Sequence, residues 1–367
     1  MADSRIVNLA RILVEYSTKV QPKDRVAIIG WPQGIPLINE VYRQALRAGG
    51  FPYVAVQPDE QKHIFFSEAN DDQLEHVNRL QEMFYCEFEV MIGIRSEANT
   101  RSLSNIDPAR QTKHKKTHAA VFETYIKRGA SGELKWVGTM FPTQSYAQDA
   151  EMSLAEFEDY VYSTTFADTE DPIAHWLAIR EEQQRLVDWL KGKKQLVVKG
   201  PNVDMQLSIE ERPFINSDGT NNMPSGEIFT SPVEDSANGW IRFSYPAVLE
   251  GRQVEGVELR FEEGKVVEAS AARNQSFLLE MLDVDAGARY LGEWAIGTNK
   301  KINRFIKNIL FDEKIGGTIH LALGAGFPEA GSKNMSAIHW DMICDMRDGG
   351  QIFADDELFY ESGEFKI

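Results

Sequence analysis

The chain has 367 residues, of which 43% are hydrophobic and 26% charged, a composition typical of soluble globular proteins and long enough for two domains. Its 56 acidic and 39 basic residues give a formal net charge of -17, which would repel phosphate backbones and anionic lipid, so neither nucleic acid nor a membrane is expected as a partner. The two cysteines, Cys86 and Cys344, are too few for a disulfide framework and are expected to be inert core thiols.

The N-terminal segment lacks the uninterrupted apolar core and the small-residue cleavage site of a signal peptide. No apolar run approaches the ~18 residues that a membrane helix needs. These two observations predict a cytoplasmic location.

The first hundred residues alternate between helical and strand patterns. Apolar residues at helical spacing predict an opening helix over 6–16, a second helix that begins at Pro36 and stops at Gly49, and a third over 74–84. Three apolar runs between these helices are predicted to be strands, at 24–30, 51–57 and 88–94. Helices in alternation with apolar strands predict a mostly parallel sheet covered by helices.

The pattern changes in the second half of the chain. A turn-rich stretch around 129–151 precedes an amphipathic helix near 173–192, and short alternating runs separated by glycine then indicate β-hairpins. The sequence therefore predicts an α/β N-terminal domain with a mostly parallel sheet at residues 1–195. A β-rich (α+β) catalytic domain is predicted at residues 196–367.

Two histidines lie in apolar segments near the C-terminus. His339 and Asp341, in AIHWD, would point to the same side of a strand and could bind one ion, although a hydrogen-bonded structural pair explains the same spacing. His320 lies in the apolar run TIHLALG, where each ring nitrogen needs a partner. A metal ion would supply one such partner, and a hydrogen bond to the backbone would supply it equally well.

Acidic residues also occur in apolar surroundings. Glu227 in MPSGEIFT and Glu293 in YLGEWAIG are flanked by apolar and small residues. Burying an unpaired carboxylate costs several kcal/mol, so each requires a cation or hydrogen-bond donors. Glu313, in FDEK, is explained equally well as a solvated loop charge. Two imidazoles and four carboxylates would suit one or two divalent ions of the Zn, Co or Mn type.

These segments resemble the thermophilic-type metallo-aminopeptidase family typified by aminopeptidases T and S. The resemblance is carried by VQPKDRVAIIG, SYAQDAEMSLAEFEDYVY, NNMPSGEIFTSPVEDSANG, YLGEWAIG, TIHLALG and SAIHWDMICD. It implies a homodimer that removes N-terminal residues from peptides with a free N-terminus. It also implies two divalent ions, Zn, Co or Mn, in a β-rich C-terminal domain.

The resemblance further implies a set of metal ligands, which are Glu227, Glu293, His320, His339 and Asp341, with Glu313 as a further candidate whose spacing to His320 is longer than the family suggests. Glu227 or Glu293 would be the general base that accepts a proton from a metal-activated water.

The chain departs from the family at Phe327, where a tyrosine usually stands. A phenylalanine cannot donate a hydrogen bond to the tetrahedral intermediate, and the loss of one such donor costs about 10²–10³ in rate. Ser332, Ser336 or a tyrosine elsewhere in the chain is a candidate replacement donor.

Two other functions remain open from the residues. His320, His339 and Asp341 form a two-histidine, one-carboxylate set that could hold a single Fe(II). The ring-opening dihydroxypyridine dioxygenases, which look like distant relatives of this chain, have that arrangement. This interpretation leaves Glu227 and Glu293 buried without a cation. The second alternative is a non-catalytic metal-binding or peptide-binding relative, for which Phe327 is the sequence support.

Overall fold

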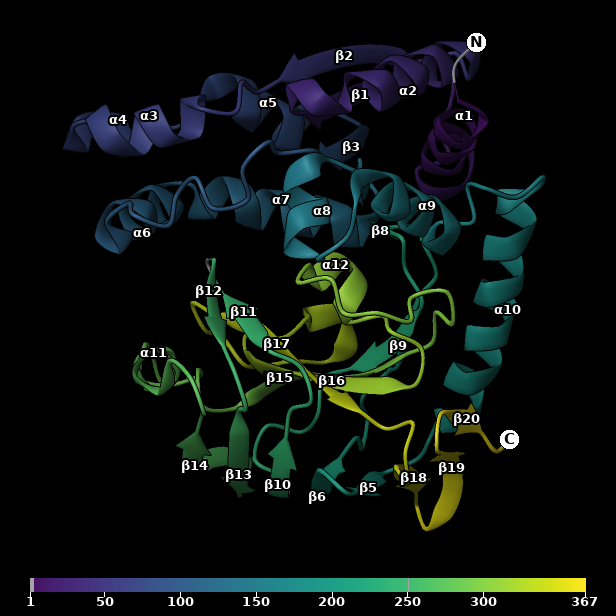
Figure 1. Cartoon of the computed structure of the whole chain (residues 1–367), viewed down its shortest axis with the longest axis vertical. Helices are drawn as coiled ribbons and strands as arrows, with labels where there is room; N and C mark the ends of the chain where they lie inside the picture. The colour runs from purple at the N-terminus through teal and green to yellow at the C-terminus, as the bar shows by residue number, and fades with distance from the viewer. Residues whose placement is uncertain (1–2, 250) are drawn as a thin grey trace. The chain divides into compact units, whose positions relative to one another are not determined.

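The computed structural model describes residues 3–249 and 251–367, which form two compact units (Figure 1). The first unit extends to Trp176 and also includes Gly219–Pro224, and the second comprises Leu177–Asp218 and the chain from Ser225 onward. The division lies inside helix α10 (Pro172–Leu190), whereas the sequence placed it near residue 195. The roles assigned to the two predicted domains remain predictions.

The first unit contains a five-stranded sheet in the order β2-β1-β3-β4-β8. Every neighbouring pair in it is parallel, as the sequence predicts. Its strands are β1 (Arg25–Gly30), β2 (Phe51–Val56), β3 (Val90–Arg95), β4 (Lys135–Met140) and β8 (Asn222–Met223). Strand β4 lies in the stretch that we expected to be turns, because its six residues are too polar to stand out as a strand.

Nine α-helices of the first unit precede, separate or follow the first four strands of this sheet along the described part of the chain. They are α1 (Ser4–Arg11), α2 (Ile35–Arg47), α3 (Gln61–Glu68), α4 (Asp71–Leu74), α5 (Arg79–Glu87), α6 (Pro108–Thr117), α7 (Ala119–Ser131), α8 (Gln144–Asp149) and α9 (Leu154–Thr164). The single helix predicted over 74–84 is wrong, because α4 ends at Leu74 and a new helix begins at Arg79. The side chain of Asn78 accepts hydrogen bonds from the backbone N–H groups of Leu80 and Gln81, which makes Asn78 an N-cap.

The second unit is β-rich, as the sequence predicts, and contains two larger antiparallel sheets. The eight-stranded sheet comprises β5 (Gln195–Gly200), β6 (Val203–Ser208), β10 (Asn238–Arg242), β13 (Glu258–Glu262), β14 (Lys265–Ser270), β18 (Gln351–Ala354), β19 (Glu357–Glu361) and β20 (Glu364–Phe365). The five-stranded sheet comprises β7 (Ile215–Ser217), β9 (Glu227–Thr230), β15 (Leu291–Gly297), β16 (Thr318–Gly324) and β17 (His339–Asp345). The hairpin β11 (Ala247–Leu249) and β12 (Arg252–Val254), and the helices α11 (Gln275–Leu282) and α12 (Ile309–Asp312), complete this unit.

One hydrophobic core joins the two large sheets of the second unit, which Figure 1 shows as separate layers. The five-stranded sheet of this unit contributes alternate residues of β15, β16 and β17 to this core, including Trp294, Leu321 and Trp340. Successive side chains on a strand point to opposite faces. The residues between them are therefore directed away from the core, and they include the histidines and acidic residues that the sequence singles out.

Candidate metal centre

Strand alternation brings five of the predicted site residues to one face of the five-stranded sheet in the second unit. Glu227 lies on β9, Glu293 on β15, His320 on β16, and His339 and Asp341 on β17. Their strands are direct neighbours in the order β17-β16-β15-β9, so residues far apart in sequence come together. This placement follows from period-two alternation, which also explains how polar residues are accommodated in apolar strands.

Small residues separate the polar side chains on this face. Ala322 pairs with both Glu293 and Asp341 in adjacent strand registers, and Ala295 pairs with His320. Both alanines are fully buried. Their short side chains leave the space between the carboxylates and imidazoles to those groups and to anything that they bind.

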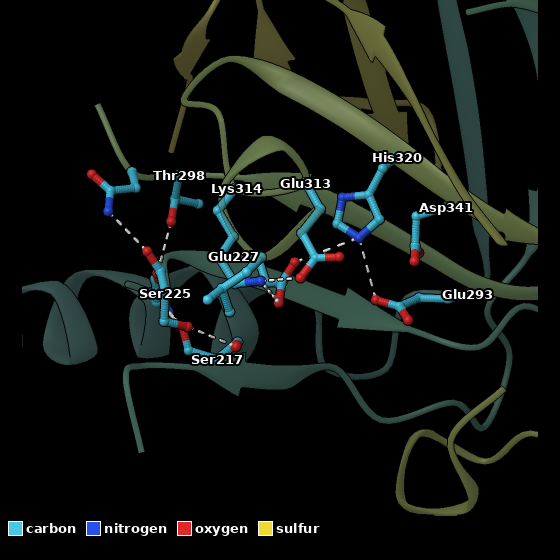
Figure 2. A network of polar contacts seen from close by, with 12 residues as sticks. Ser217, Ser225, Glu227, Glu293, Thr298, Glu313, Lys314, His320 and Asp341 are labelled. Atoms are coloured by element: carbon cyan, nitrogen blue, oxygen red, sulfur yellow. Dashed lines mark hydrogen bonds and ion pairs between the residues drawn. The ribbon is translucent and has the colours of Figure 1, made fainter. Parts of the chain in front are cut away.

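Glu313 reaches the same cluster from the C-terminal end of α12 (Figure 2). Ligand atoms within each of three groups lie within 4.8 Å of one another, and the groups are Glu227, Glu293 and His320; Glu293, His339 and Asp341; and Glu313, His320 and Asp341. The structure thus brings together all six residues that the sequence proposed as metal ligands. Because each group shares a member with another, they form one continuous cluster.

The distances between the imidazoles and the carboxylates are compatible with a shared cation and are long for direct hydrogen bonds, of which His320 to Glu293 is one. His320 Nε2 lies 3.4 Å from Glu293 Oε1 and 3.5 Å from Glu227 Oε2. His339 Nε2 lies 3.5 Å from Glu293 Oε2 and 3.4 Å from Asp341 Oδ1. All four distances exceed the usual N–H···O range of about 2.7–3.2 Å. Two ligand atoms bound to one zinc ion at the tetrahedral angle would be about 3.4 Å apart.

Two carboxylate oxygens of this cluster, Glu227 Oε2 and Asp341 Oδ1, are buried and have no hydrogen-bond partner. His320 Nδ1 also lacks a partner, but the nitrogen of this ring that faces the carboxylates is Nε2. Buried polar atoms in proteins are nearly always satisfied, and exceptions require an explanation such as an ion. The set of imidazole nitrogens and carboxylate oxygens is chemically suited to Zn, Co or Mn. The residues present therefore fit the divalent ion that the sequence predicts.

A backbone contact fixes the orientation of one imidazole. His339 Nδ1 lies 2.7 Å from the carbonyl oxygen of Ala325, which can only accept a hydrogen bond. Nδ1 therefore carries the proton, and Nε2 faces Glu293 and Asp341. Such a hydrogen bond on the far nitrogen is the usual support of a metal-binding histidine.

Hydrogen bonds around Ser225 hold the segment that precedes Glu227. Asn299 Nδ2 donates to the carbonyl oxygen of Ser225 at 2.9 Å, and Ser225 Oγ donates to the carbonyl oxygen of Ser217 at 2.8 Å. The two serine hydroxyls are also 2.8 Å apart (Figure 2). This network anchors the main chain immediately before the buried carboxylate.

Burial and charge act in opposite directions on the titratable groups. Burial raises the pKa values of Glu227, Glu293 and Glu313. Burial alone would lower the pKa of His320, but the carboxylates of Glu293 and Glu227 raise it to about 9. Burial would likewise lower the pKa of His339, which Asp341 and Glu293 raise to about 10. Both imidazoles thus lie in a strongly negative field that attracts a cation.

Sequence reasoning missed one charged member of the cluster, Lys314. Its side chain is fully buried, and its Nζ lies 3.4 Å from Glu227 Oε1 and forms an ion pair with Glu313 Oε1. Burial lowers the pKa of this ammonium group, but Glu227 and Glu313 raise it above the ordinary value. The only signal in the sequence is that Lys314 follows Glu313 directly and precedes the apolar strand of His320.

Phe327, which stands where the resembling family has a tyrosine, lies beside the cluster. Its ring centroid is 5.3 Å from that of His339 and 5.5 Å from that of Phe229, and 37% of the residue is exposed. Of the two serines considered as replacement donors, Ser336 donates its hydroxyl to Asp285 at 2.9 Å. Ser332 Oγ accepts a hydrogen bond from the backbone N–H of Asn334 at 3.2 Å, so its hydroxyl proton is not used in that bond.

Comparison with known proteins identifies the family to which this chain belongs. The family model described as thermophilic metalloprotease (M29) matches residues 2–365. The chain belongs to the M29 family. The resemblance proposed from the sequence is thereby confirmed, and so is the prediction of a metal-dependent enzyme that hydrolyses peptide bonds.

Individual members of the M29 family are similar over most of the chain. Aminopeptidase 2 of Geobacillus stearothermophilus is 26% identical over 356 residues, which cover 87% of this chain and 83% of the relative. The structure of wild-type AmpT from Thermus thermophilus has a TM-score of 0.87, with 20% identity and 99% of each chain covered. The fold class predicted from the sequence is thus that of a solved structure.

A second solved structure has a related fold. The 2,5-dihydroxypyridine dioxygenase of Pseudomonas putida KT2440 has a TM-score of 0.57 and 13% identity, over 99% of this chain and 96% of that one. A likeness at this identity concerns the fold alone.

No helix in the described part of the chain is both long and apolar enough to cross a membrane.

Proposed function

We propose that this M29 protein is an aminopeptidase that uses two divalent ions to hydrolyse the N-terminal peptide bond of peptides. The observation that supports two ions is the placement of Glu293. Its Oε1 faces His320 and its Oε2 faces His339, so Glu293 could help to hold an ion beside each imidazole. The proposal takes its substrate class from relatives named aminopeptidases.

The ligands proposed for one ion are Glu227, Glu293 and His320, and those for the other are Glu293, His339 and Asp341. Three protein ligands on each ion leave a position for water or substrate, as catalytic sites require. Glu313 is proposed as a further ligand. Zn, Co and Mn all suit these nitrogen and oxygen ligands. A homodimer remains an expectation from the family resemblance, and a cytoplasmic location remains an expectation from the sequence.

Bound divalent ions would activate a water and polarise the scissile carbonyl group. The chain itself must then accept a proton from that water. Glu227 and Glu293 are the two candidates for this base, and we propose Glu227 for the first test because its buried Oε2 has no hydrogen-bond partner, whereas Glu293 Oε1 is hydrogen-bonded to His320 Nε2. The buried setting raises the pKa of Glu227 and so makes its carboxylate a stronger base.

The proposal can be tested with aminoacyl-p-nitroanilides and short peptides. Metal-stripped protein is reconstituted separately with Zn, Co, Mn and Fe(II), and Glu227→Gln is compared with Glu258→Gln, which changes an exposed glutamate of the same unit. We expect metal-dependent release of the N-terminal residue, a loss of about 10²–10⁴-fold in Glu227→Gln because a general base contributes that much, and full activity in the control.

Peptides with an acetylated N-terminus should resist cleavage, and two metal ions should be retained per chain. Stoichiometric metal binding without hydrolysis of any substrate would refute the proposal and favour the binding-protein alternative. Aerobic ring opening of an aromatic diol by the Fe(II) form alone would favour the dioxygenase alternative.

A further inference from the structure

Lys314 supplies a positive charge inside the candidate metal centre without being a possible metal ligand at neutral pH. Its side chain has 0% exposure, and its Nζ lies between Oε1 of Glu227, at 3.4 Å, and Oε1 of Glu313 (Figure 2). Glu227 and Glu313 approach this ammonium group from different elements, β9 and the end of α12. Lys314 therefore links two parts of the chain that each deliver a carboxylate to the site.

The main chain of Lys314 is fixed on both sides. Its N–H donates to the carbonyl oxygen of Phe311 at 2.9 Å, and its own carbonyl oxygen accepts from the N–H of Asn299 at 3.2 Å. These bonds fix the main chain of Lys314, and its side chain is fully buried. Burying a lone ammonium group costs several kcal/mol, so the two carboxylates must compensate for its burial.

Charge makes this arrangement important when no metal is bound. Four carboxylates lie in the cluster, and like charges at these distances repel strongly where water is excluded. Lys314 forms ion pairs with two of these carboxylates, those of Glu227 and Glu313. Once divalent ions bind, they neutralise the same carboxylates, so Glu227 and Glu313 depend less on the ammonium group.

We propose that Lys314 is a positioning residue that acts as the built-in counter-ion of Glu227 and Glu313 in the metal-free site. It holds Glu227 and Glu313 in place while the ions are absent, and it competes electrostatically with the ions for the same carboxylates. This inference rests on the proposed metal centre. It predicts that Lys314 stabilises the metal-free protein more than the metal-loaded protein, and that it weakens metal binding.

The experiment compares Lys314→Met with the wild-type protein by thermal unfolding, in EDTA and in excess zinc, and by zinc titration calorimetry. Lys193→Met is the matched control, because Lys193 pairs with Glu357 in the same unit, away from the cluster. We expect Lys314→Met to lower the Tm more in EDTA than in zinc and to raise zinc affinity about tenfold. Lys193→Met should change neither the zinc affinity nor the difference between the two Tm values.

The double variant Glu313→Gln/Lys314→Met tests the pairing itself. Removing both charges of a buried pair costs less than removing one, so the double variant should recover at least half of the Tm lost in EDTA. It also preserves the test if Lys314→Met does not fold in EDTA. Equal Tm losses with and without zinc, or a zinc affinity that falls, would overturn the inference. If the wild type bound no divalent ion, the proposed metal function would fail, whereas the comparison of Lys314→Met with its double variant in EDTA would still test the pairing.

Discussion

Gly226 packs so closely against Asn299 that a Cβ atom on the glycine would lie 2.6 Å from the Cβ atom of Asn299. The glycine also has a φ of +118°, which lies in a region that other residues avoid. Asn299 in turn holds the carbonyl group of Ser225. The contact between these two residues therefore sets the position of the main chain at the start of β9, which begins at Glu227.

Gly226→Ala should consequently damage both stability and metal binding. Backbone strain at such a φ costs about 1–3 kcal/mol, and overpacking adds about 1–3 kcal/mol. We expect a loss of about 2–5 kcal/mol in the free energy of unfolding, measured by urea titration, and weaker zinc binding. Gly192→Ala is the control, since Gly192 also has a positive φ, +84°, but nothing lies within 4 Å of its added Cβ atom. A loss in Gly192→Ala as large as in Gly226→Ala would show that strain alone matters.

Much of the site could be predicted because it follows from strand alternation. His320, Glu293 and Asp341 each interrupt an apolar run, and the period of two places them on the face opposite Trp294 and Trp340. The parallel sheet of the first unit was likewise predicted, since its first three strands are separated by helices. A single sequence thus contains the local pattern that orients each strand.

Contacts between distant segments could not be predicted in the same way. Strand β8 pairs with β4, although it follows the first strands of the second unit, so the domain division is not a single point in the sequence. Lys314 resembles an ordinary surface lysine in sequence, and only the fold shows that its side chain is buried between Glu227 and Glu313. Cys86 was expected in the core but is only half-buried, whereas Cys344 is buried as expected.

Enlarging Ala322 tests whether the face between Glu293 and Asp341 holds a metal ion. The Cβ atom of Ala322 lies in the cross-strand row between these two carboxylates, so Ala322→Leu should occupy the space that an ion requires. We expect at least one zinc ion per chain to be lost, as measured by plasma mass spectrometry.

The Tm of Ala322→Leu in EDTA should fall by no more than a few degrees, because overpacking costs about 1–3 kcal/mol. Far-UV circular dichroism should match the wild type. Full retention of zinc in a folded variant would contradict the placement of the ions between these strands.

Restoring a hydroxyl at Phe327 tests the departure from the family pattern. The ring of Phe327 lies against that of His339, so Phe327→Tyr places a donor at the edge of the candidate site. An oxyanion donor contributes about 10²–10³ in kcat. We expect kcat on aminoacyl-p-nitroanilides to rise at least tenfold with little change in KM. Phe122→Tyr, at a 58% exposed position, should leave kcat unchanged. No gain in Phe327→Tyr would indicate that another group, such as Ser332, already donates.

Asp285 anchors the segment that leads into His339, and its effect on stability should depend on pH. Its Oδ2 accepts a hydrogen bond from the backbone N–H of Ala337 at 2.7 Å, and the hydroxyl of Ser336 also donates to it. Burial raises the pKa of this carboxyl group, but these donors outweigh burial and hold the pKa below its ordinary value of 3.8.

A depressed pKa in the folded protein means that the ionised carboxylate stabilises the fold above the unfolded pKa, near 4, and that this contribution disappears as the pH falls through the lower folded value. Asp285→Asn should therefore lower the Tm in EDTA by about 2–6 °C at pH 7, corresponding to the loss of hydrogen bonds to a charged group worth about 1–2 kcal/mol. The difference from the wild type should shrink between about pH 5 and pH 3. Asp235→Asn, at an exposed position of the same unit, serves as the control. A Tm difference for Asp285→Asn that stayed constant from pH 7 to pH 3 would show that its charge is not what anchors the segment.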